Sequence, residues 1–219
     1  MSRDTNTEMM RRARAAVREA TALLITAGAG MGVDSGLPDF RGPEGFWRAY
    51  PPYRHLGLRF EELASPHWFR EDPPLAWGFY GHRLMLYRTT RPHDGFGALL
   101  RLAAGRPGGA FVYTSNVDGQ FQLAGFDPQR IAECHGSIHR LQCLADCGQP
   151  LFEAAPFSVQ VDPATMRARE PLPSCPRCGA LARPNICLLY TSDAADDLLC
   201  VDLGGSRIIK KKKKMMRLF

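Results

Sequence analysis

Lysine is absent from the first 209 residues of this 219-residue chain, and all five lysines form one run at 210–214. Arginine supplies the other basic side chains, and residues 1–186 hold 21 arginines against 18 acidic residues. The net charge of +6 is therefore divided equally between residues 1–186, the body of the chain, and the tail 187–219. Positive and negative charges are nearly balanced in the body. A strongly basic surface would indicate nucleic acid as a partner, so the balanced body makes nucleic-acid binding unexpected.

Long apolar runs are also missing from the chain. No stretch of 18 apolar residues occurs, so we expect no membrane-spanning helix. The first 20 residues lack the apolar segment of a secretory signal, which predicts a cytoplasmic protein with no membrane partner. The hydrophobic content of 45% and the 12 phenylalanines are too high for a disordered chain. We expect a monomer that consists of one large domain, or of a core domain and a small module.

Short apolar runs alternate with helical patterns in the first 136 residues. Strands are predicted at 21–27, 110–114 and 130–134, and all three are expected to be buried. Helices are predicted at 8–20, 61–71, 73–90 and 95–104, with a short one within 117–124 and a long loop at 37–57. This alternation is typical of an α/β fold with a parallel sheet, whose ligand crevice lies at the carboxyl ends of the strands.

Four cysteines form two closely spaced pairs in the irregular, proline-rich segment 137–184. The pairs are Cys143 with Cys147, and Cys175 with Cys178. Four thiolates in two short turns fit a tetrahedral, structural Zn²⁺ site, and we predict one zinc ion there. Two disulfides or four unrelated core thiols are the alternatives. Cys134 is expected to be a core residue at the end of a strand.

A glycine turn, Gly28-Ala29-Gly30, follows the first predicted strand. Glycines at such a turn let the backbone approach a pyrophosphate, and a following helix would offer free amides. This pattern alone is weak evidence, because the third glycine and the acidic residue typical of a dehydrogenase are not in place. The residues that follow, 34–42 (DSGLPDFRG), are denser in polar groups than a surface loop requires.

Four motifs in one order resemble those of the sirtuin family. They are GAGMGVDSGLPDFRG at 28–42, TSNVD at 114–118, His135-Gly136, and the two cysteine pairs. The resemblance covers about residues 10–186. The chain departs from the family pattern at Met31, where a serine is usual, at Ser115, where glutamine is usual, and in the spacing of the first cysteine pair.

The resemblance implies a Rossmann-like parallel sheet, here incomplete, with an inserted small zinc-ribbon domain and a helical module. The implied divisions are 1–45 for the first part of the NAD domain, 46–95 for the cofactor loop and helical module, and 96–136 for the strands with the catalytic motifs. The zinc domain would span 137–183 and an aberrant tail 184–219.

The resemblance also implies an NAD-dependent protein-lysine deacylase that takes acylated-lysine proteins or peptides as substrates. In that family the acyl oxygen attacks C1′ of the nicotinamide ribose and nicotinamide leaves. His135 would then be the general base on a ribose hydroxyl, leading to O-acyl-ADP-ribose, and imidazole titrates in the range that suits this task. Asn116 and Asp118 would hold the ribose and the nicotinamide amide.

Further contacts with NAD follow from the same resemblance. Phe40 would shield C1′ from water, and Asp39 and Arg41 would organise the cofactor loop. The phosphates and the remaining part of NAD would be contacted by Gly28, Ala29, Gly30 and Ser115. The implied cofactors are therefore NAD and one structural Zn²⁺.

Tyr80 and Arg83 share a face of the predicted helix 73–90, because they are three residues apart. A tyrosine hydroxyl and a guanidinium together suit a carboxylate, and the pair resembles the Tyr-x-x-Arg of sirtuins that remove succinyl and malonyl groups. We therefore expect acidic acyl groups to be accepted as well as acetyl. The alternative is an arginine on the helix surface beside a core tyrosine.

Two other functions stay open at this point. One is mono-ADP-ribosyl transfer, in which another nucleophile captures the same ribosyl intermediate. The other is a zinc-ribbon binding fragment without activity, in which the lysine run would contact nucleic acid. This second alternative gives no role to Asn116, Asp118 and His135.

The tail 187–219 matches none of the motifs that we recognise in the family. Lysine usage changes in the same part of the chain, so we expect a frameshift or a foreign sequence joined near residue 187, with a genuine basic tail as the alternative. The strands that close the family's sheet would then be missing. Such a polypeptide is expected to be poorly stable or weakly active.

Overall fold

The computed structural model describes residues 3–38, 50–55, 57–58 and 60–187. A parallel sheet in the order β1-β2-β3 is formed by β1 (Leu23–Ala27), β2 (Ala110–Thr114) and β3 (Ile131–Glu133). Leu23 pairs with Ala110, and Val112 pairs with Ile131. The predicted α/β fold with a parallel sheet is confirmed, and the three strands lie where the apolar runs placed them.

One face of this sheet is packed by helices, whereas the other carries exposed side chains among the residues that the structure describes. Helices α7 (Asp94–Ala104) and α8 (Gln120–Leu123) contribute Phe96 and Phe121 to a core around Val112. On the opposite face Leu24 is 70% exposed and Tyr113 45% exposed. The expectation that these strands are buried therefore holds for one face of β1 and β2 only, because their alternate side chains point away from the helices.

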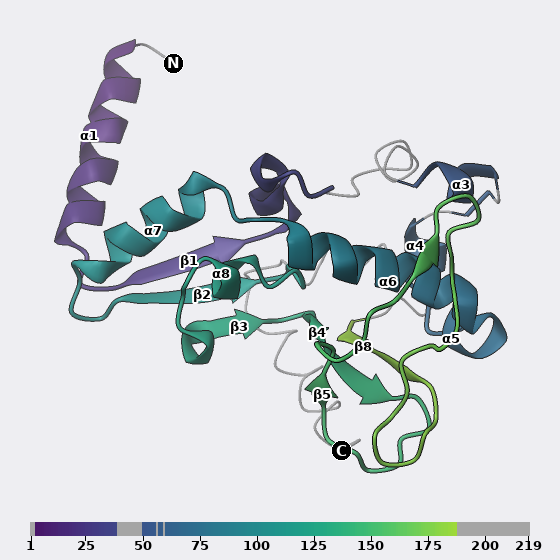
Figure 1. Ribbon diagram of the computed structural model, residues 1–219. Helices are drawn as coiled ribbons and strands as arrows, with labels where there is room; N and C mark the ends of the chain where they lie inside the picture. The colour runs from purple at the N-terminus through teal and green to yellow at the C-terminus, as the bar shows by residue number, and fades with distance from the viewer. Residues whose placement is uncertain (1–2, 39–49, 56, 59, 188–219) are drawn as a thin grey trace, which may run out of the picture.

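Helix α1 (Arg3–Glu19) precedes the sheet and lies at the end remote from the antiparallel strands (Figure 1). Two short 3₁₀ helices, η1 (Ala29–Ser35) and η2 (Pro128–Arg130), lie next to the sheet in sequence. None of the helices among the described residues is long and apolar enough to cross a membrane.

Helix α6 (Pro73–Thr89) is the longest element of the helical module. It begins where the Asp72 side chain accepts a hydrogen bond from the Leu75 amide, 3.2 Å away, with two prolines in the first turn. The single helix predicted at 61–71 is instead two, α4 (Phe60–Leu63) and α5 (Trp68–Glu71), with Pro66 between them. Within the predicted loop 37–57 lies a further short helix, α3 (Pro51–His55).

The segment expected to be irregular contains several short strands. The three-stranded antiparallel sheet β5-β4-β8 is formed by β4 (Gly136–Cys143), β5 (Phe152–Glu153) and β8 (Ala182–Ile186). A separate hairpin is formed by β6 (Val161–Asp162) and β7 (Arg167–Ala168). Figure 1 shows this hairpin beside α6, at the end of the molecule opposite to α1.

Glycines on α6 allow the β6–β7 hairpin to approach the helix closely. A Cβ atom at Gly78 would lie 1.9 Å from the Met166 carbonyl oxygen, and one at Gly81 would lie 2.4 Å from a methyl carbon of Val159. The Tyr53 hydroxyl donates to the same Met166 carbonyl at 3.1 Å. The helical module and the hairpin therefore share one core, and α6 has no room for a side chain at Gly78.

We predict that Gly78→Ala destabilises the protein by about 1–3 kcal/mol, because the methyl group would overlap backbone atoms that cannot rotate away. Gly97→Ala is the matched control: it is also a helical glycine, but the added Cβ would meet only the tip of Arg101 at 3.3 Å. The control should be neutral or up to about 1 kcal/mol more stable, since alanine favours helix. Urea unfolding measures both, and equal stabilities for the two variants would contradict the packing described for α6.

Candidate active site and cysteine cluster

The carboxyl ends of β1 and β2 are joined by hydrogen bonds from side chains and backbone. The Thr114 hydroxyl and the Ser115 amide both donate to the Ala27 carbonyl, at 3.1 and 3.2 Å. The Asn116 side-chain amide donates to the Gly28 carbonyl at 3.0 Å. The predicted glycine turn and the TSNVD motif at 114–118 are therefore in direct contact.

The glycine turn offers exposed backbone at this edge of the sheet. Gly28, Ala29 and Gly30 are all exposed, and a Cβ at Gly28 would lie 3.6 Å from the Ser115 hydroxyl oxygen. The element that follows is the seven-residue 3₁₀ helix η1, and the Met31 amide bonds to the Gly28 carbonyl at 2.9 Å. The turn can thus be approached by a ligand from solvent.

His135 connects the parallel sheet with the antiparallel one. The preceding Cys134 amide donates to the Thr114 carbonyl at 2.9 Å, and the His135 carbonyl accepts from the Cys187 amide at 2.8 Å. The His135 side chain is half-buried. The expectation that Cys134 is a core residue is wrong: its side chain is exposed, because the chain leaves β3 at this point.

Asp118 is buried close to these residues, at 7% exposure. Its carboxylate accepts a hydrogen bond from the Gln120 amide at 2.9 Å. Burial raises the pKa of the Asp118 carboxyl, while the Gln120 amide and the charge of His139 oppose this shift. Burial also raises the pKa of Glu133. A carboxylate in such a site accepts hydrogen bonds strongly from any ligand that supplies N–H groups.

The four paired cysteines come together in space. The sulfur atoms of Cys143, Cys147, Cys175 and Cys178 all lie within 4.8 Å of one another. The Cys143–Cys178 and Cys147–Cys175 sulfur distances are 3.5 and 3.6 Å. Tetrahedral zinc with bonds of 2.3 Å requires sulfur separations of about 3.8 Å. The donor set and its spacing therefore fit zinc, and all four cysteines are free thiols rather than disulfides.

Two cysteines of the cluster have pKa values that are shifted in opposite directions. Although the Ala180 amide opposes the shift, hydrogen bonds with the Cys147 and Cys143 side chains raise the pKa of Cys178 to about 12. The Cys147 amide, followed by the Ala145 amide, donates hydrogen bonds that lower the pKa of Cys143 to about 7. Gly148 and Gly179 adopt positive φ angles of 77° and 74° after each pair, so each turn can fold back over its sulfur atoms.

Tyr80 and Arg83 lie within the core of the helical module rather than on the helix surface. Tyr80 is 1% exposed and Arg83 7% exposed. The Arg83 guanidinium donates twice to the Tyr87 hydroxyl, at 2.9 and 3.1 Å. It also lies 5.2 Å from the ring centre of Phe79. Burial raises the pKa of Tyr80, so its hydroxyl stays neutral and can donate a hydrogen bond.

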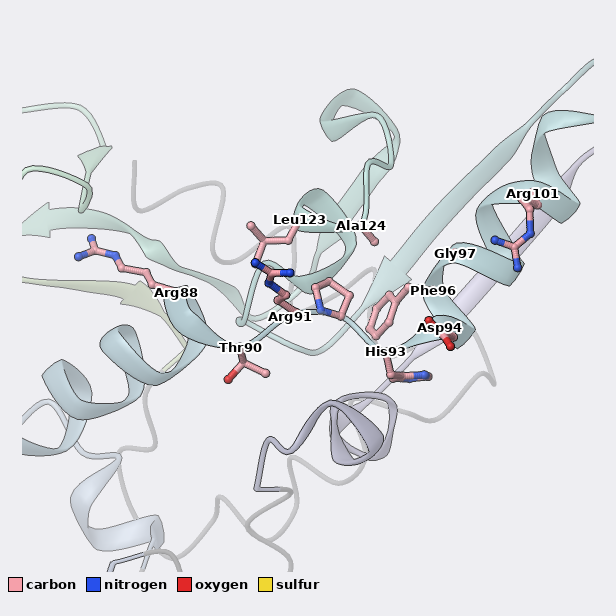
Figure 2. Close-up of a pocket in the computed structure, with 11 residues that line it drawn as sticks. Arg88, Thr90, Arg91, His93, Asp94, Phe96, Gly97, Arg101, Leu123 and Ala124 are labelled. Carbon is pink, nitrogen blue, oxygen red and sulfur yellow. The ribbon is translucent and has the colours of Figure 1, made fainter.

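A surface pocket of about 700 Å³ lies between the end of α6, the start of α7 and α8, as Figure 2 shows. Arg88, Arg91 and Arg101 contribute to its wall. In the close-up Arg88 lies at one end and Arg101 at the other, so the three guanidinium groups do not converge on one point. None of the residues that line this pocket is a predicted site residue.

Three predicted NAD contacts, Asp39, Phe40 and Arg41, lie outside the described residues. The same holds for the tail after Cys187.

Comparison with known proteins identifies the family. The sequence profile of the Sir2 family matches residues 28–197, which is more than half of the chain. The chain belongs to the Sir2 family. The match continues past Ile186, so the family resemblance does not end where the motifs placed its limit.

Several Sir2 relatives have curated names. The NAD-dependent protein deacylase of Aquifex aeolicus is 32% identical over 164 residues, which cover 75% of this chain and 59% of that protein. The NAD-dependent protein deacylase 2 of Pyrobaculum aerophilum is 37% identical, with 74% and 56% covered. The mitochondrial NAD-dependent protein deacylase sirtuin-5 of Danio rerio is 33% identical, with 85% and 66% covered. This Sir2 chain therefore spans less than two thirds of these relatives.

Solved Sir2 structures share the fold. The crystal structure of a Sir2 homologue–NAD complex has a TM-score of 0.61 and 28% identity, covering 85% of this chain and 65% of the other. An ADP-ribose complex of a Sir2 homologue mutant has a TM-score of 0.60 and 29% identity, covering 84% and 65%.

The structure adds two residues that sequence reasoning missed in this Sir2 chain. Tyr87 binds the Arg83 guanidinium, and its spacing of four residues along α6 could have pointed to it. The His139 Nε2 atom lies 2.8 Å from the Asp118 carbonyl oxygen. No sequence motif marks His139, because the contact depends on how β4 meets the loop after β2.

We predict that the purified Sir2 chain carries one zinc ion per molecule, and that Cys178→Ser loses it together with part of its resistance to heat. A three-sulfur site binds zinc more weakly, and structural zinc contributes directly to folding. Elemental analysis and thermal unfolding measure the two effects. Cys134→Ser, which changes an exposed cysteine outside the cluster, is the control. A full equivalent of zinc in Cys178→Ser would contradict the site.

We predict that Asp118→Asn gains stability relative to wild type as the pH rises. A carboxyl whose pKa is raised by folding contributes stability below its unfolded pKa, near 3.9, and loses it as the pH rises through the folded pKa. Asparagine keeps the acceptor for the Gln120 amide but does not titrate. Thermal unfolding between pH 4 and pH 7 measures the difference, which should grow with pH.

The matched control for this series is Asp127→Asn. Asp127 is exposed and makes the same kind of hydrogen bond, to the Gln129 amide at 2.9 Å. A stability difference between Asp118→Asn and wild type that stays constant from pH 4 to pH 7 would contradict the burial of this carboxyl.

Proposed function

We propose that this chain is an NAD-dependent protein-lysine deacylase, with acylated-lysine proteins or peptides as substrates. The observation that carries the proposal is the direct contact between Asn116 on the loop after β2 and Gly28 in the turn after β1. Ligands of open parallel sheets bind outside the carboxyl ends of the strands, and Gly28 and Asn116 lie at that edge. The NAD-dependent deacylase names of the relatives support the same activity.

NAD would supply an activated ribose whose nicotinamide can be displaced by the acyl oxygen. Gly28, Ala29 and Gly30 would contact the phosphates through their backbone, as the exposure of the turn allows. Asn116 and Ser115 would hold the ribose. The buried Asp118 carboxylate would accept the N–H groups of the nicotinamide amide, which fixes the ring for departure.

His135 would act as the general base on a ribose hydroxyl. Its half-buried imidazole lies between β3 and β4, on a backbone held by hydrogen bonds to Thr114 and Cys187. Imidazole accepts a proton readily near neutral pH. Asp39, Phe40 and Arg41 would complete the site from the loop after η1. The four cysteines would hold a structural zinc ion and take no part in the reaction.

The function is tested by incubating the purified chain with acetyl-lysine and succinyl-lysine peptides, with and without NAD. Mass spectrometry should detect free-lysine peptide and nicotinamide in equal amounts, only when NAD is present. His135→Ala should lose at least about a hundredfold in rate, the contribution of general base catalysis, whereas His67→Ala changes an exposed histidine and should not. Deacylation without NAD would refute the proposal, and ADP-ribose attached to protein would indicate a transferase instead.

The substrate class is extended by Tyr80 and Arg83, which would bind the distal carboxylate of succinyl-lysine or malonyl-lysine. Their burial among aromatic rings excludes water, so a charged hydrogen bond to a carboxylate would be strong. We predict that Arg83→Met lowers kcat/KM for a succinyl peptide by about 10–100-fold and leaves acetyl turnover less affected. Arg101→Met, an exposed arginine on α7, is the control. An equal loss of kcat/KM on the succinyl and acetyl peptides would contradict this assignment.

A further inference from the structure

The loop that carries Asp118 is held by two adjacent residues of β4. The Ile138 amide donates to the Val117 carbonyl at 3.1 Å, and the His139 ring nitrogen Nε2 lies 2.8 Å from the Asp118 carbonyl oxygen. The first bond uses backbone atoms and can form with any residue at 138 except proline. The second bond depends on the side chain, so residue 139 decides how firmly the Asp118 peptide is held.

The partner atom determines that Nε2 of His139 is the donor in this hydrogen bond. A carbonyl oxygen can only accept, so Nε2 must carry the proton that forms this hydrogen bond. The imidazole ring is partly buried and also packs against Gly119, the residue that follows Asp118. A Cβ atom at Gly119 would lie 2.8 Å from both Cδ2 and Nε2 of the ring. Gly119 has a φ of 74°, a conformation that favours glycine.

The two peptides that flank Gly119 are each held by a hydrogen bond. His139 bonds to the Asp118 carbonyl of the first peptide, and the Leu123 amide of α8 donates to the Gly119 carbonyl of the second at 3.0 Å. The Asp118 carboxylate in turn accepts the Gln120 amide at 2.9 Å. The carboxylate side chain and the bonded carbonyl group both leave the Asp118 Cα atom, so a displacement of the backbone at Asp118 would move the carboxylate.

We propose that His139 is a positioning residue, whose Nε2–H bond to the Asp118 carbonyl fixes the Asp118 carboxylate for the nicotinamide amide of NAD. This inference rests on the proposed function, since it assigns Asp118 to nicotinamide. His139 lies four residues after His135 on the same segment. The segment that enters β4 would therefore supply the general base, His135, and also position Asp118, the residue that would bind the nicotinamide amide.

The test compares three variants of the full, zinc-loaded chain. His139→Phe keeps an aromatic ring but removes the donor, and should raise both the KM for NAD and the inhibition constant of nicotinamide about fivefold, the equivalent of about 1 kcal/mol. His139→Gln keeps an N–H donor, so its KM for NAD and its inhibition constant for nicotinamide should be close to the wild-type values. The KM for the acyl peptide should stay unchanged in both. In an Asp118→Ala background His139→Phe should have no further effect.

Each result has a defined meaning. The inference is overturned if His139→Phe leaves the KM for NAD and the inhibition constant of nicotinamide unchanged. It is also overturned if His139→Phe raises these constants by the same factor in the Asp118→Ala background as in the wild-type chain. A parallel rise in the KM for the peptide, or failure of His139→Gln to restore, indicates a general structural role and also overturns it. If the wild-type chain neither binds nor consumes NAD, the proposed function itself fails, and this inference fails with it.

The tautomer gives a second readout that needs no activity. In ¹⁵N-labelled protein without NAD, the His139 imidazole should carry its proton on Nε2 at neutral pH. A proton on Nδ1 alone would overturn the inference, because the hydrogen bond to Asp118 could not form.

Discussion

The pairing of β4 with β8 is the contact on which the rest of the molecule depends. It begins at Gly136, opposite Ile186, and ends at Cys143, opposite Ala182. A Cβ atom at Gly136 would lie 2.1 Å from the Asn185 carbonyl oxygen, and the residue has a φ of 82°. Only glycine meets both requirements at this position. The start of the antiparallel sheet is thereby fixed one residue after His135.

The eight residues of β4 connect three parts of the protein. Their first residues hold the loop after β2 through Ile138 and His139, and their last residue, Cys143, belongs to the sulfur cluster. A side chain in the middle, Leu141, is fully buried in the core shared with α6. A zinc ion in the cluster would hold the far end of the strand and so restrict its near end, where His135 lies. In this way a structural metal can matter for the chemistry without contacting any substrate.

The sequence allowed much of this arrangement to be predicted. Apolar runs located β1, β2 and β3 because short apolar runs between helical patterns are typical of strands in a parallel sheet. Cysteine spacing located the metal cluster because ligand spacing is constrained by geometry. The exposure of Leu24 and Tyr113 was not predicted, since an apolar run does not indicate which faces of the sheet are covered by helices. Strands β5, β6 and β7 have two residues each and carry no periodic signal.

The contacts of the site depend on distances that no motif encodes. Tyr87 and His139 were missed because one acts through Arg83 and the other through the backbone of Asp118. In each contact the motifs name one residue, Arg83 or Asp118, and leave its partner out. The tight approach of Gly78 to Met166 was likewise not evident, because it joins positions 88 residues apart in the chain.

The central claim is that NAD binds where β1 and β2 end, between the glycine turn and the loop that carries Asn116 and Asp118. Titration of the ¹⁵N-labelled chain with NAD, followed by NMR, tests it most directly. The account predicts that the amide signals of residues 28–30 and 114–119 shift first and saturate together, while those of the cysteine turns stay in place. Shifts centred on the arginine-lined pocket between α6 and α7, or no saturable shift at all, would contradict it.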